Sequence, residues 1–156
     1  MYLWLKLVHV LAVVMFVGNI VTGVFWHKHA QKTRDARLLA HTMDGVIRSD
    51  RLFTMPGVLL ILASGIYAAI QGGFPILHTH WIAWTIALFA ISGIVFGARL
   101  APLQKRMHAL AGAGAKGGAF DIAEYQRLSR QWDFWGAVAT ATPLAGVALM
   151  VLKPAL

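Results

Sequence analysis

Four long stretches of apolar residues set the pattern of this chain. They extend from about residue 2 to 26, from 52 to 71, from 81 to 98 and from 132 to 152. A helix of about 20 apolar residues crosses the hydrocarbon core of a bilayer, which is roughly 30 Å thick. The stretches are continuously apolar and show no alternation of polar and apolar positions. They therefore predict transmembrane helices rather than the strands of a barrel.

Basic residues are concentrated between these stretches. Residues 27–51 contain six Lys and Arg residues and residues 99–131 contain six more, whereas residues 72–80 contain none. Loops rich in Lys and Arg stay on the cytoplasmic side of a membrane. We therefore expect cytoplasmic loops at 27–51 and 99–131, with both termini on the outer face. Short connections then favour one all-α domain over residues 1–156, an integral membrane four-helix up-down bundle.

The tryptophans support these boundaries, because the indole ring favours the headgroup region of a bilayer. All six lie near the expected ends of the first, third and fourth helices: Trp4, Trp26, Trp81, Trp84, Trp132 and Trp135. Beyond the first helix, apolar positions between 38 and 47 recur at helical spacing. This spacing predicts an amphipathic helical extension on the cytoplasmic side.

Composition excludes a soluble protein. Of the 156 residues, 58% are hydrophobic and 13% are charged, against about 45–50% and roughly 25% in soluble domains. The chain has no cysteine, so disulfides, thiolate metal ligands and cysteine nucleophiles are excluded. The formal net charge of +8 would fit a nucleic-acid-binding protein. The placement of the basic residues indicates instead contact with anionic lipid headgroups and no nucleic acid.

Small residues indicate where helices approach one another closely. Gly93 and Gly97 form a small-xxx-small pair in the third helix. The fourth helix has a similar surface, formed by Gly136, Ala139, Thr140 and Gly146. Such faces let helix backbones pack closely, either within a bundle or between chains. A homo-oligomer or a complex with a membrane partner subunit is therefore compatible with the sequence.

The start of the second helix combines a proline with two residues that often cap helices. Pro56 predicts a kink there, because proline has no N–H and its ring clashes with the carbonyl four residues earlier. Asp50 and Thr54 come just before Pro56. Capping of the first N–H groups of the helix by Asp50 or Thr54 is the favoured interpretation. A catalytic or proton-carrying role for Asp50 is the alternative.

His9 is the residue within the apolar stretches that most needs an explanation, because ionisable side chains inside a membrane are costly and rare. At 100° per residue, His9 shares a face of the first helix with Lys6 and Asn19, so a polar stripe is expected to point into the bundle. The expected topology brings His78 and His80, just before the third helix, to the same leaflet.

Two interpretations of His9 are open. Imidazoles from two helices of a bundle hold a b-type haem in its axial positions, so His9 with His78 or His80 is a candidate pair for haem iron. A haem propionate is then a candidate partner for Lys6, and a neutral imidazole also suits Cu or Zn. In the other interpretation His9 forms a hydrogen bond within the bundle, the other two histidines are solvated and Lys6 snorkels outward.

The histidines on the cytoplasmic side, among them His27, could form a separate metal site, but surface positions explain them as well.

Four segments, at 5–9 (LKLVH), 50–56 (DRLFTMP), 103–107 (LQKRM) and 150–154 (MVLKP), occur in an order that resembles a known family. This family is the predicted integral membrane proteins grouped as domain of unknown function 2269. The resemblance covers nearly the whole chain. It implies a multi-pass protein of the bacterial inner membrane with four helices and no established activity.

The chain is also distantly similar to the HemJ-type protoporphyrinogen oxidases, small four-helix membrane proteins that associate with haem. The similarity rests on a W-x-K-x-x-H start, an early proline in the second helix and a terminal Lys-Pro, matched by Trp4, Lys6, His9, Pro56, Lys153 and Pro154. His78 aligns with a histidine at the start of their third helix, whereas His80 stands where they have a lysine. The resemblance implies haem binding through His9, with His78 as the second candidate.

The sequence thus favours two classes of function. One is a redox or haem-handling membrane protein that binds haem b through His9 and a histidine before the third helix. The alternative is a non-enzymatic membrane subunit, or a permease for a small solute or a metal, without a cofactor. The sequence contains no pattern typical of a hydrolytic triad, a carboxylate pair or a phosphate-binding loop.

Overall fold

The computed structural model describes residues 2–76 and 78–153, and these residues are helical almost throughout. Two long helices are uninterrupted, α1 (Tyr2–Gln31) and α6 (Ile122–Leu152). The other two each contain one wide π-helical turn. One of these interrupted helices consists of α2 (Ala36–Ser49), η1 (Asp50–Thr54) and α3 (Met55–Gln71). The other consists of α4 (His80–Val95), η2 (Phe96–Leu100) and α5 (Ala101–Ala115).

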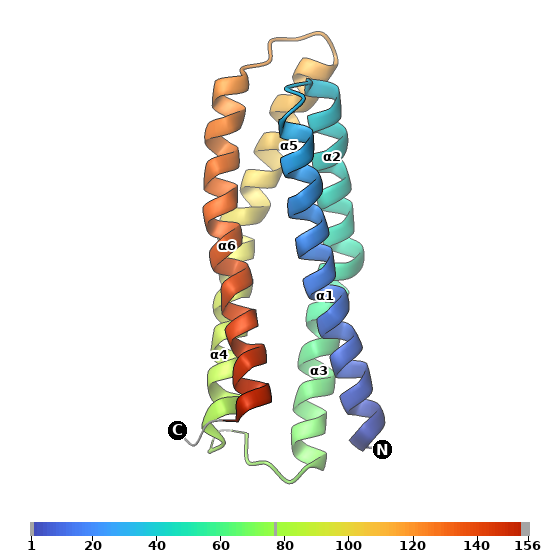
Figure 1. The fold of residues 1–156 in the computed structure, drawn as a ribbon, viewed down its shortest axis with the longest axis vertical. Coiled ribbons are helices and arrows are strands. Elements are labelled where there is room, and N and C mark those ends of the chain that lie inside the picture. The colour runs from blue at the N-terminus through green and yellow to red at the C-terminus, as the bar shows by residue number, and fades with distance from the viewer. Residues whose placement is uncertain (1, 77, 154–156) are drawn as a thin grey trace.

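The four long helices form an up-down bundle (Figure 1). Each is long and apolar enough to cross a membrane, so the predicted all-α membrane bundle is confirmed. The first and last described residues lie at the same end as the 72–79 connection, which we call the terminal end. The connections 32–35 and 116–121 lie at the opposite end. We call this the basic end, because the two segments that hold twelve of the 14 Lys and Arg residues lie toward it.

The connections at the basic end are shorter than the sequence predicts. Most residues of the expected loops 27–51 and 99–131 are helical, and only 32–35 and 116–121 connect the helices. The helices continue because one face of each extension stays apolar, which confirms the amphipathic extension predicted from positions 38–47. These faces form a shared core, which includes Leu39, Met43, Val46, Leu103, Met107, Ala111, Tyr125, Leu128 and Trp132.

Proline explains where the two interrupted helices widen. Pro56 follows η1 and Pro102 follows η2, each at the second position of the next α-helix. A proline ring clashes with the carbonyl four residues before it and has no N–H to donate to that carbonyl. The backbone instead forms a bond across five residues, from the Met55 N–H to the Asp50 carbonyl in η1, and η2 has the equivalent bond. The irregularity predicted near Pro56 is therefore a π-helical turn.

A third proline, Pro143, is buried inside α6. It leaves the Ala139 carbonyl without its usual intrahelical donor, and the Ser92 hydroxyl of α4 donates a hydrogen bond to this carbonyl at 2.6 Å. Serine and threonine often satisfy backbone groups that proline frees in membrane helices. A second bond between the same helices runs from the Thr85 hydroxyl to the Gly146 carbonyl at 3.3 Å.

The small residues divide into two groups. Those of α6 lie against α4 as predicted, since a Cβ on Gly146 would be 3.0 Å from Cγ2 of Thr85. Gly93 and Gly97 do not pack closely within the chain, because nothing in the described residues would lie within 4 Å of a Cβ on either glycine. Packing of this pair between chains stays a prediction. The face of α4 that meets α6 instead carries Thr85 and Ser92, which are two turns apart.

The helices pack in two pairs. α1 packs along α3 and α4 packs along α6, while α2 packs along α5 and joins the two hairpins in the basic half. Figure 1 shows the α4–α6 pair and the α1–α3 pair lying apart in the terminal half. Near the middle of the bundle, Phe16 of α1 and Phe89 of α4 contact each other across the pairs, with ring centroids 5.6 Å apart. The shared core of the basic half thus gives way to two separate pairs at about this height.

Candidate functional site

Four polar side chains meet at the middle of the bundle, and we call them the Asp50 cluster. η1 supplies Asp50 and Thr54, α1 supplies Asn19 and α5 supplies Gln104. The Asn19 amide donates to Thr54 Oγ1 at 2.9 Å and to Asp50 Oδ1 at 3.3 Å. The Thr54 hydroxyl donates to the same carboxylate oxygen at 2.8 Å. The Gln104 amide donates to the other oxygen, Oδ2, also at 2.8 Å. The cluster therefore links three of the four long helices.

A cavity of about 240 Å³ adjoins the Asp50 cluster. All four long helices line it, and both π-helical turns contribute, with Asp50 and Thr54 from η1 and with Phe96 and Leu100 from η2. Most of the lining is apolar and includes Phe16, Ile20, Val58, Phe89 and Trp132. A mostly apolar cavity with a few polar groups is typical of a ligand site, and π-helical turns occur frequently at functional sites.

Asp50 has no cationic partner within the part of the chain that the structure describes. The three ion pairs formed by the described residues lie elsewhere. They join Lys28 to Asp133, Arg48 to Asp44 and Arg127 to Glu124. The neighbouring Arg51 is exposed. Three neutral donors therefore stabilise the Asp50 carboxylate. Since a carboxylate offers about four lone-pair sites, it retains the capacity to accept from a further donor or to bind a cation.

The depth of the Asp50 cluster makes this arrangement unusual. The apolar stretch 2–26 is centred near residue 14, and Asn19 lies five residues farther along α1. At 1.5 Å per residue this offset is about 8 Å, whereas half the hydrocarbon thickness is about 15 Å. On this count Asn19, and with it Asp50, lies at a membrane-spanning depth rather than in the cytoplasmic loop expected at 27–51. Ionisable residues are rare at such depths and mark functional sites.

The capping role favoured for Asp50 and Thr54 from the sequence is wrong, whereas the alternative of a proton-carrying Asp50 stays a prediction. Neither side chain caps a helix, because the helix runs from Ala36 to Gln71 with no new N-terminus at this point. Gln104 was missed altogether, since the apolar pattern of the third helix does not show which face turns inward. The available signal was Asp50 itself, a carboxylate at the edge of an apolar stretch in a chain with only six acidic residues.

His9 lies on the seam between α1 and α3. Its Nδ1 is 3.0 Å from the Ile61 carbonyl oxygen and 3.3 Å from Ser64 Oγ. Because a carbonyl oxygen can only accept, Nδ1 carries the proton and donates, which leaves Nε2 as an acceptor nitrogen. The ring rests on Gly65, where an added Cβ would be 2.8 Å from the His9 Cε1. The hydrogen bond within the bundle, one of the two interpretations from the sequence, is thus present.

The other predicted site residues are exposed. His78 lies in the 72–79 connection, and His80 begins α4, which packs along α6. Lys6 is exposed on α1, one turn from His9. Within residues 2–76 and 78–153, no group of three or more His, Cys, Asp or Glu residues could hold a metal ion.

The structure also buries a histidine that the sequence placed at the surface. His27 of α1 is fully buried, and its Nε2 is 3.1 Å from Ser129 Oγ of α6. Its ring lies against Trp132, with centroids 4.9 Å apart. The burial follows from the helical extensions, because residues beyond Trp26 are still inside the bundle.

Comparison with known protein families decides where the chain belongs. The model of a family described as predicted integral membrane protein, domain of unknown function 2269, matches residues 3–154. The chain belongs to this family. With its four apolar helices, this member of the family is a multi-pass integral membrane protein. No curated protein and no solved structure matches the chain.

Three of the four segments that resemble the domain of unknown function 2269 family contribute to the sites described above. Segment 50–56 supplies two members of the Asp50 cluster and segment 103–107 supplies Gln104. Segment 5–9 supplies His9, which packs on α3 nearer the terminal end. The fourth segment ends at Pro154, which lies outside the described residues. The likeness to the HemJ-type oxidases stays a prediction.

Proposed function

We propose that this protein binds a small cation, the proton included, at Asp50, and acts as a permease for it or as the cation-binding subunit of a membrane complex. The observation that carries the proposal is a carboxylate inside the bundle, next to a cavity, that is stabilised only by neutral donors. A charge buried in a membrane is costly unless an opposite charge compensates it. A bound cation or proton supplies this compensation.

The interrupted helices support a transport role. Many transporters bind ions near the middle of the membrane, where helices are broken and their backbone is irregular. Here η1 and η2 belong to different hairpins and both line the cavity. On the side of the terminal end, the Phe16–Phe89 contact lies between the two helix pairs. A small movement of one hairpin relative to the other would change access to Asp50.

Flux measurements in proteoliposomes test this function. The vesicles contain the full-length protein, and the fluxes of H⁺, Na⁺ and K⁺ are recorded with a trapped pH dye and ion-selective electrodes. We expect the protein to carry at least one of these ions above the rate of empty vesicles. Asp50→Asn should abolish that flux, because the amide has a similar shape but no charge.

Asp44→Asn is the matched control. Asp44 lies on the same long helix and is paired with Arg48 at 2.7 Å on the outside of the bundle, so its loss should leave the flux unchanged. Circular dichroism and gel filtration verify that both variants are folded. A flux equal to that of empty vesicles, or one that survives Asp50→Asn, would contradict a transport role. Stabilisation of the purified protein by an added cation, lost in Asp50→Asn only, would support the subunit form of the proposal.

Haem binding is a second candidate function, and the hydrogen bond of His9 favours it. A histidine that binds a metal usually donates its other ring N–H to a carbonyl or a carboxylate, as Nδ1 of His9 donates to Ile61. Haem b held by His9 and by His78 or His80 would link the α1–α3 pair to the α4–α6 pair. Lys6 would then lie beside a propionate. Such a haem would supply one-electron redox chemistry.

The visible spectrum tests the haem proposal independently of the flux. Protein produced with a sufficient haem supply and purified in detergent should show a Soret band, and His9→Ala should remove it. His41→Ala, an exposed residue near the basic end, is the control and should keep the band. His78→Ala and His80→Ala would show which of these two histidines is the second ligand. The absence of a Soret band in the unaltered protein would contradict the proposal.

We also propose that the protein resides in the bacterial inner membrane with its basic end in the cytoplasm. The positive-inside rule supports this orientation, because the basic segments lie toward one end of the bundle. Fusions at the C-terminus test it, with alkaline phosphatase expected to be active and green fluorescent protein expected to be dark. The reverse result would contradict this orientation.

A further inference from the structure

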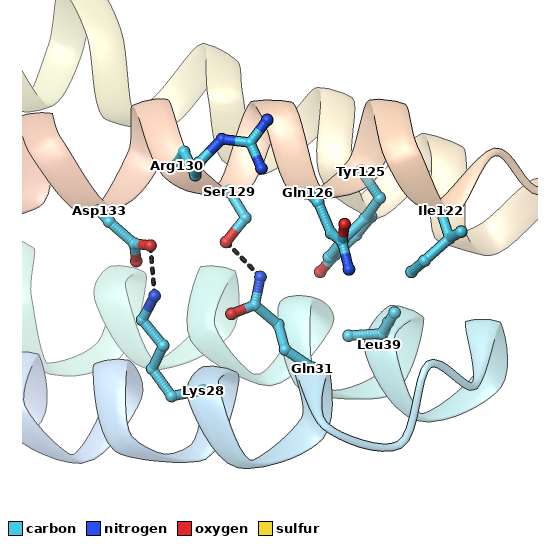
Figure 2. Close-up of a pocket in the computed structure, with 9 residues that line it drawn as sticks. All are labelled: Lys28, Gln31, Leu39, Ile122, Tyr125, Gln126, Ser129, Arg130 and Asp133. Atoms are coloured by element: carbon cyan, nitrogen blue, oxygen red, sulfur yellow. Dashed lines mark hydrogen bonds and ion pairs between the residues drawn. The ribbon is translucent and has the colours of Figure 1, made fainter.

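A second pocket, of about 180 Å³, lies between α1 and α6 toward the basic end. Figure 2 shows its lining: Asp133 and Ser129 of α6 face Lys28 and Gln31 of α1 across the pocket, whereas the Arg130 side chain lies along α6. Two cations border it, Lys28 of α1 and Arg130 of α6. Gln31, Gln126 and Tyr125 are also among its lining residues. It is separate from the cavity of the Asp50 cluster, whose lining shares none of these residues.

The charges of the pocket favour an anion. Lys28 forms an ion pair with Asp133, which neutralises it in part (Figure 2). Arg130 takes part in none of the ion pairs formed by the described residues. The two cations and one carboxylate leave a net charge of +1 at the pocket. A guanidinium group has five N–H donors in a planar fork that matches phosphate oxygens.

Tyr125 provides an independent indication that the pocket holds a ligand. The residue is 0% exposed, and its hydroxyl has no hydrogen-bond partner among the described residues. Its ring is fixed between Phe120 and His27, with centroids 5.9 and 6.1 Å away. A buried hydroxyl without a partner destabilises a fold by about 1–3 kcal/mol. A ligand oxygen can accept this hydrogen bond only after the side chains that cover the hydroxyl move aside.

The pocket lies at the level expected for lipid headgroups. Lys28 comes two residues after the exposed Trp26, which is about 3 Å along α1, and Arg130 of α6 borders the same pocket. Tryptophan marks the membrane interface. Lys28 and Arg130 are exposed, whereas Tyr125 is buried, so the two cations lie at the mouth of the pocket.

We propose that this pocket binds the phosphate of an anionic phospholipid. Arg130 contacts the phosphate oxygens and Lys28 adds a second positive charge. The Tyr125 hydroxyl donates to the deepest oxygen once the side chains that cover it move aside. Basic pockets between membrane helices on the cytoplasmic side are known to bind acidic lipid headgroups. A lipid held there would stabilise the contact between α1 and α6 where these helices leave the hydrocarbon core of the membrane. The proposal does not depend on ion or haem binding.

Native mass spectrometry of the full-length protein in detergent tests this proposal. The protein is mixed separately with phosphatidylglycerol, phosphatidylcholine and a soluble mixture of inorganic phosphate and glycerol phosphate. We expect retention of phosphatidylglycerol with a Kd at least about tenfold lower than that for phosphatidylcholine, because loss of one charge-assisted contact changes affinity by about this factor. The soluble phosphates should be retained less than phosphatidylglycerol.

Variants then locate the bound lipid. Arg130→Gln and Tyr125→Phe should each weaken phosphatidylglycerol binding about fivefold to tenfold. Tyr125→Phe keeps the ring and removes only the unpartnered hydroxyl, so the lipid-free protein should unfold at the same or a higher temperature. Arg127→Gln is the matched control, since Arg127 lies on the same helix but is paired with Glu124, and it should bind like the unaltered protein.

Three results would overturn the proposal. The first is equal binding of phosphatidylglycerol and phosphatidylcholine. The second is an equal effect of Arg130→Gln and Arg127→Gln, which would indicate a diffuse attraction to the basic surface. The third is retention of the soluble phosphates in preference to the lipid, which would assign the pocket to a soluble phosphate compound. None of these results bears on the flux through the Asp50 site, so the two proposals can fail separately.

Discussion

The Ser92 hydroxyl donates a hydrogen bond to the Ala139 carbonyl at 2.6 Å, and this is the carbonyl that Pro143 leaves without an intrahelical donor. One side chain of α4 thus compensates for a proline in α6. The bond lies beside the cavity of the Asp50 cluster, which both Ser92 and Ala139 line. It therefore helps to fix the distance between the two helices at the height of the site.

Removal of this hydroxyl should destabilise the bundle through the freed carbonyl. We expect Ser92→Ala to lower the free energy of unfolding by about 0.5–2 kcal/mol, measured by denaturation in detergent. In a Pro143→Ala background the residue at 143 regains an N–H that can bond to the Ala139 carbonyl. In that background Ser92→Ala should leave the free energy of unfolding almost unchanged. If Ser92→Ala lowers the free energy of unfolding equally in both backgrounds, the bond does not compensate for the proline.

Gln104 holds the Asp50 carboxylate from the opposite hairpin, at 2.8 Å. Gln104→Leu keeps the approximate size of the side chain and removes one of three donors to a carboxylate. We expect the free energy of unfolding to fall by about 1–3 kcal/mol. The same substitution at the exposed Gln71, at the end of α3, should change it by less than about 0.5 kcal/mol. Similar effects at the two positions would contradict the role assigned to Gln104.

The contact between Gly65 and His9 leaves no space for a side chain. In Gly65→Ala the new Cβ would be 2.8 Å from Cε1 and 3.0 Å from Nδ1 of His9, so the ring must move and its bond to Ile61 must lengthen. We expect a loss of about 1–3 kcal/mol in unfolding free energy, which His9→Ala should largely relieve in the double variant.

Gly18→Ala is the control for this prediction. Nothing in the described structure would lie within 4 Å of a Cβ at Gly18, and alanine favours the helix by about 0.5–1 kcal/mol. This variant should therefore be as stable as the unaltered protein or more so. If Gly65→Ala behaves like Gly18→Ala, then His9 is not held as the structure places it.

Gly114 lies at a tightly packed position at the basic end, where there is no space for a side chain. A Cβ there would be 2.5 Å from the Phe120 Cβ and 2.9 Å from the Ala36 Cβ, so Gly114→Ala must push the end of α5 away from its neighbours. We expect destabilisation of about 1–3 kcal/mol and faster proteolysis in the 116–121 connection. Gly112, two residues earlier, has open space around it, and Gly112→Ala should not accelerate cleavage. Equal cleavage rates would contradict this packing.

The helices were predictable because the signal for them is local. Continuous apolar length determines what can cross a membrane, and clustered Lys and Arg residues mark the ends. The ends of the helices were less accessible to prediction. The amphipathic pattern of residues 38–47 indicated that the helices extend beyond the membrane, but apolar stretches alone could not show that only 32–35 and 116–121 remain as connections.

The candidate site was predictable only in part. His9 and Asn19 were found on one polar face of the first helix, because a helical period can be read from a single segment. Gln104 is separated from Asp50 by 54 residues, and His27 from Ser129 by 102. No local pattern specifies which faces of separate helices meet. For the same reason the sequence placed Asp50 at a helix start and His27 at the surface.

The sequence by itself determined that the protein is a membrane bundle of four helices, that its charge is gathered toward one end and that it resembles the family to which it belongs. Transfer of apolar length from water to lipid is a property of each segment alone, so these features follow without knowledge of the packing. Only the tertiary structure decided that Asp50 is held by donors from two other helices and that Lys28 and Arg130 border one pocket. Contacts between residues of different helices depend on the rotation of each helix and on which helices pair. The packing of the whole bundle determines both.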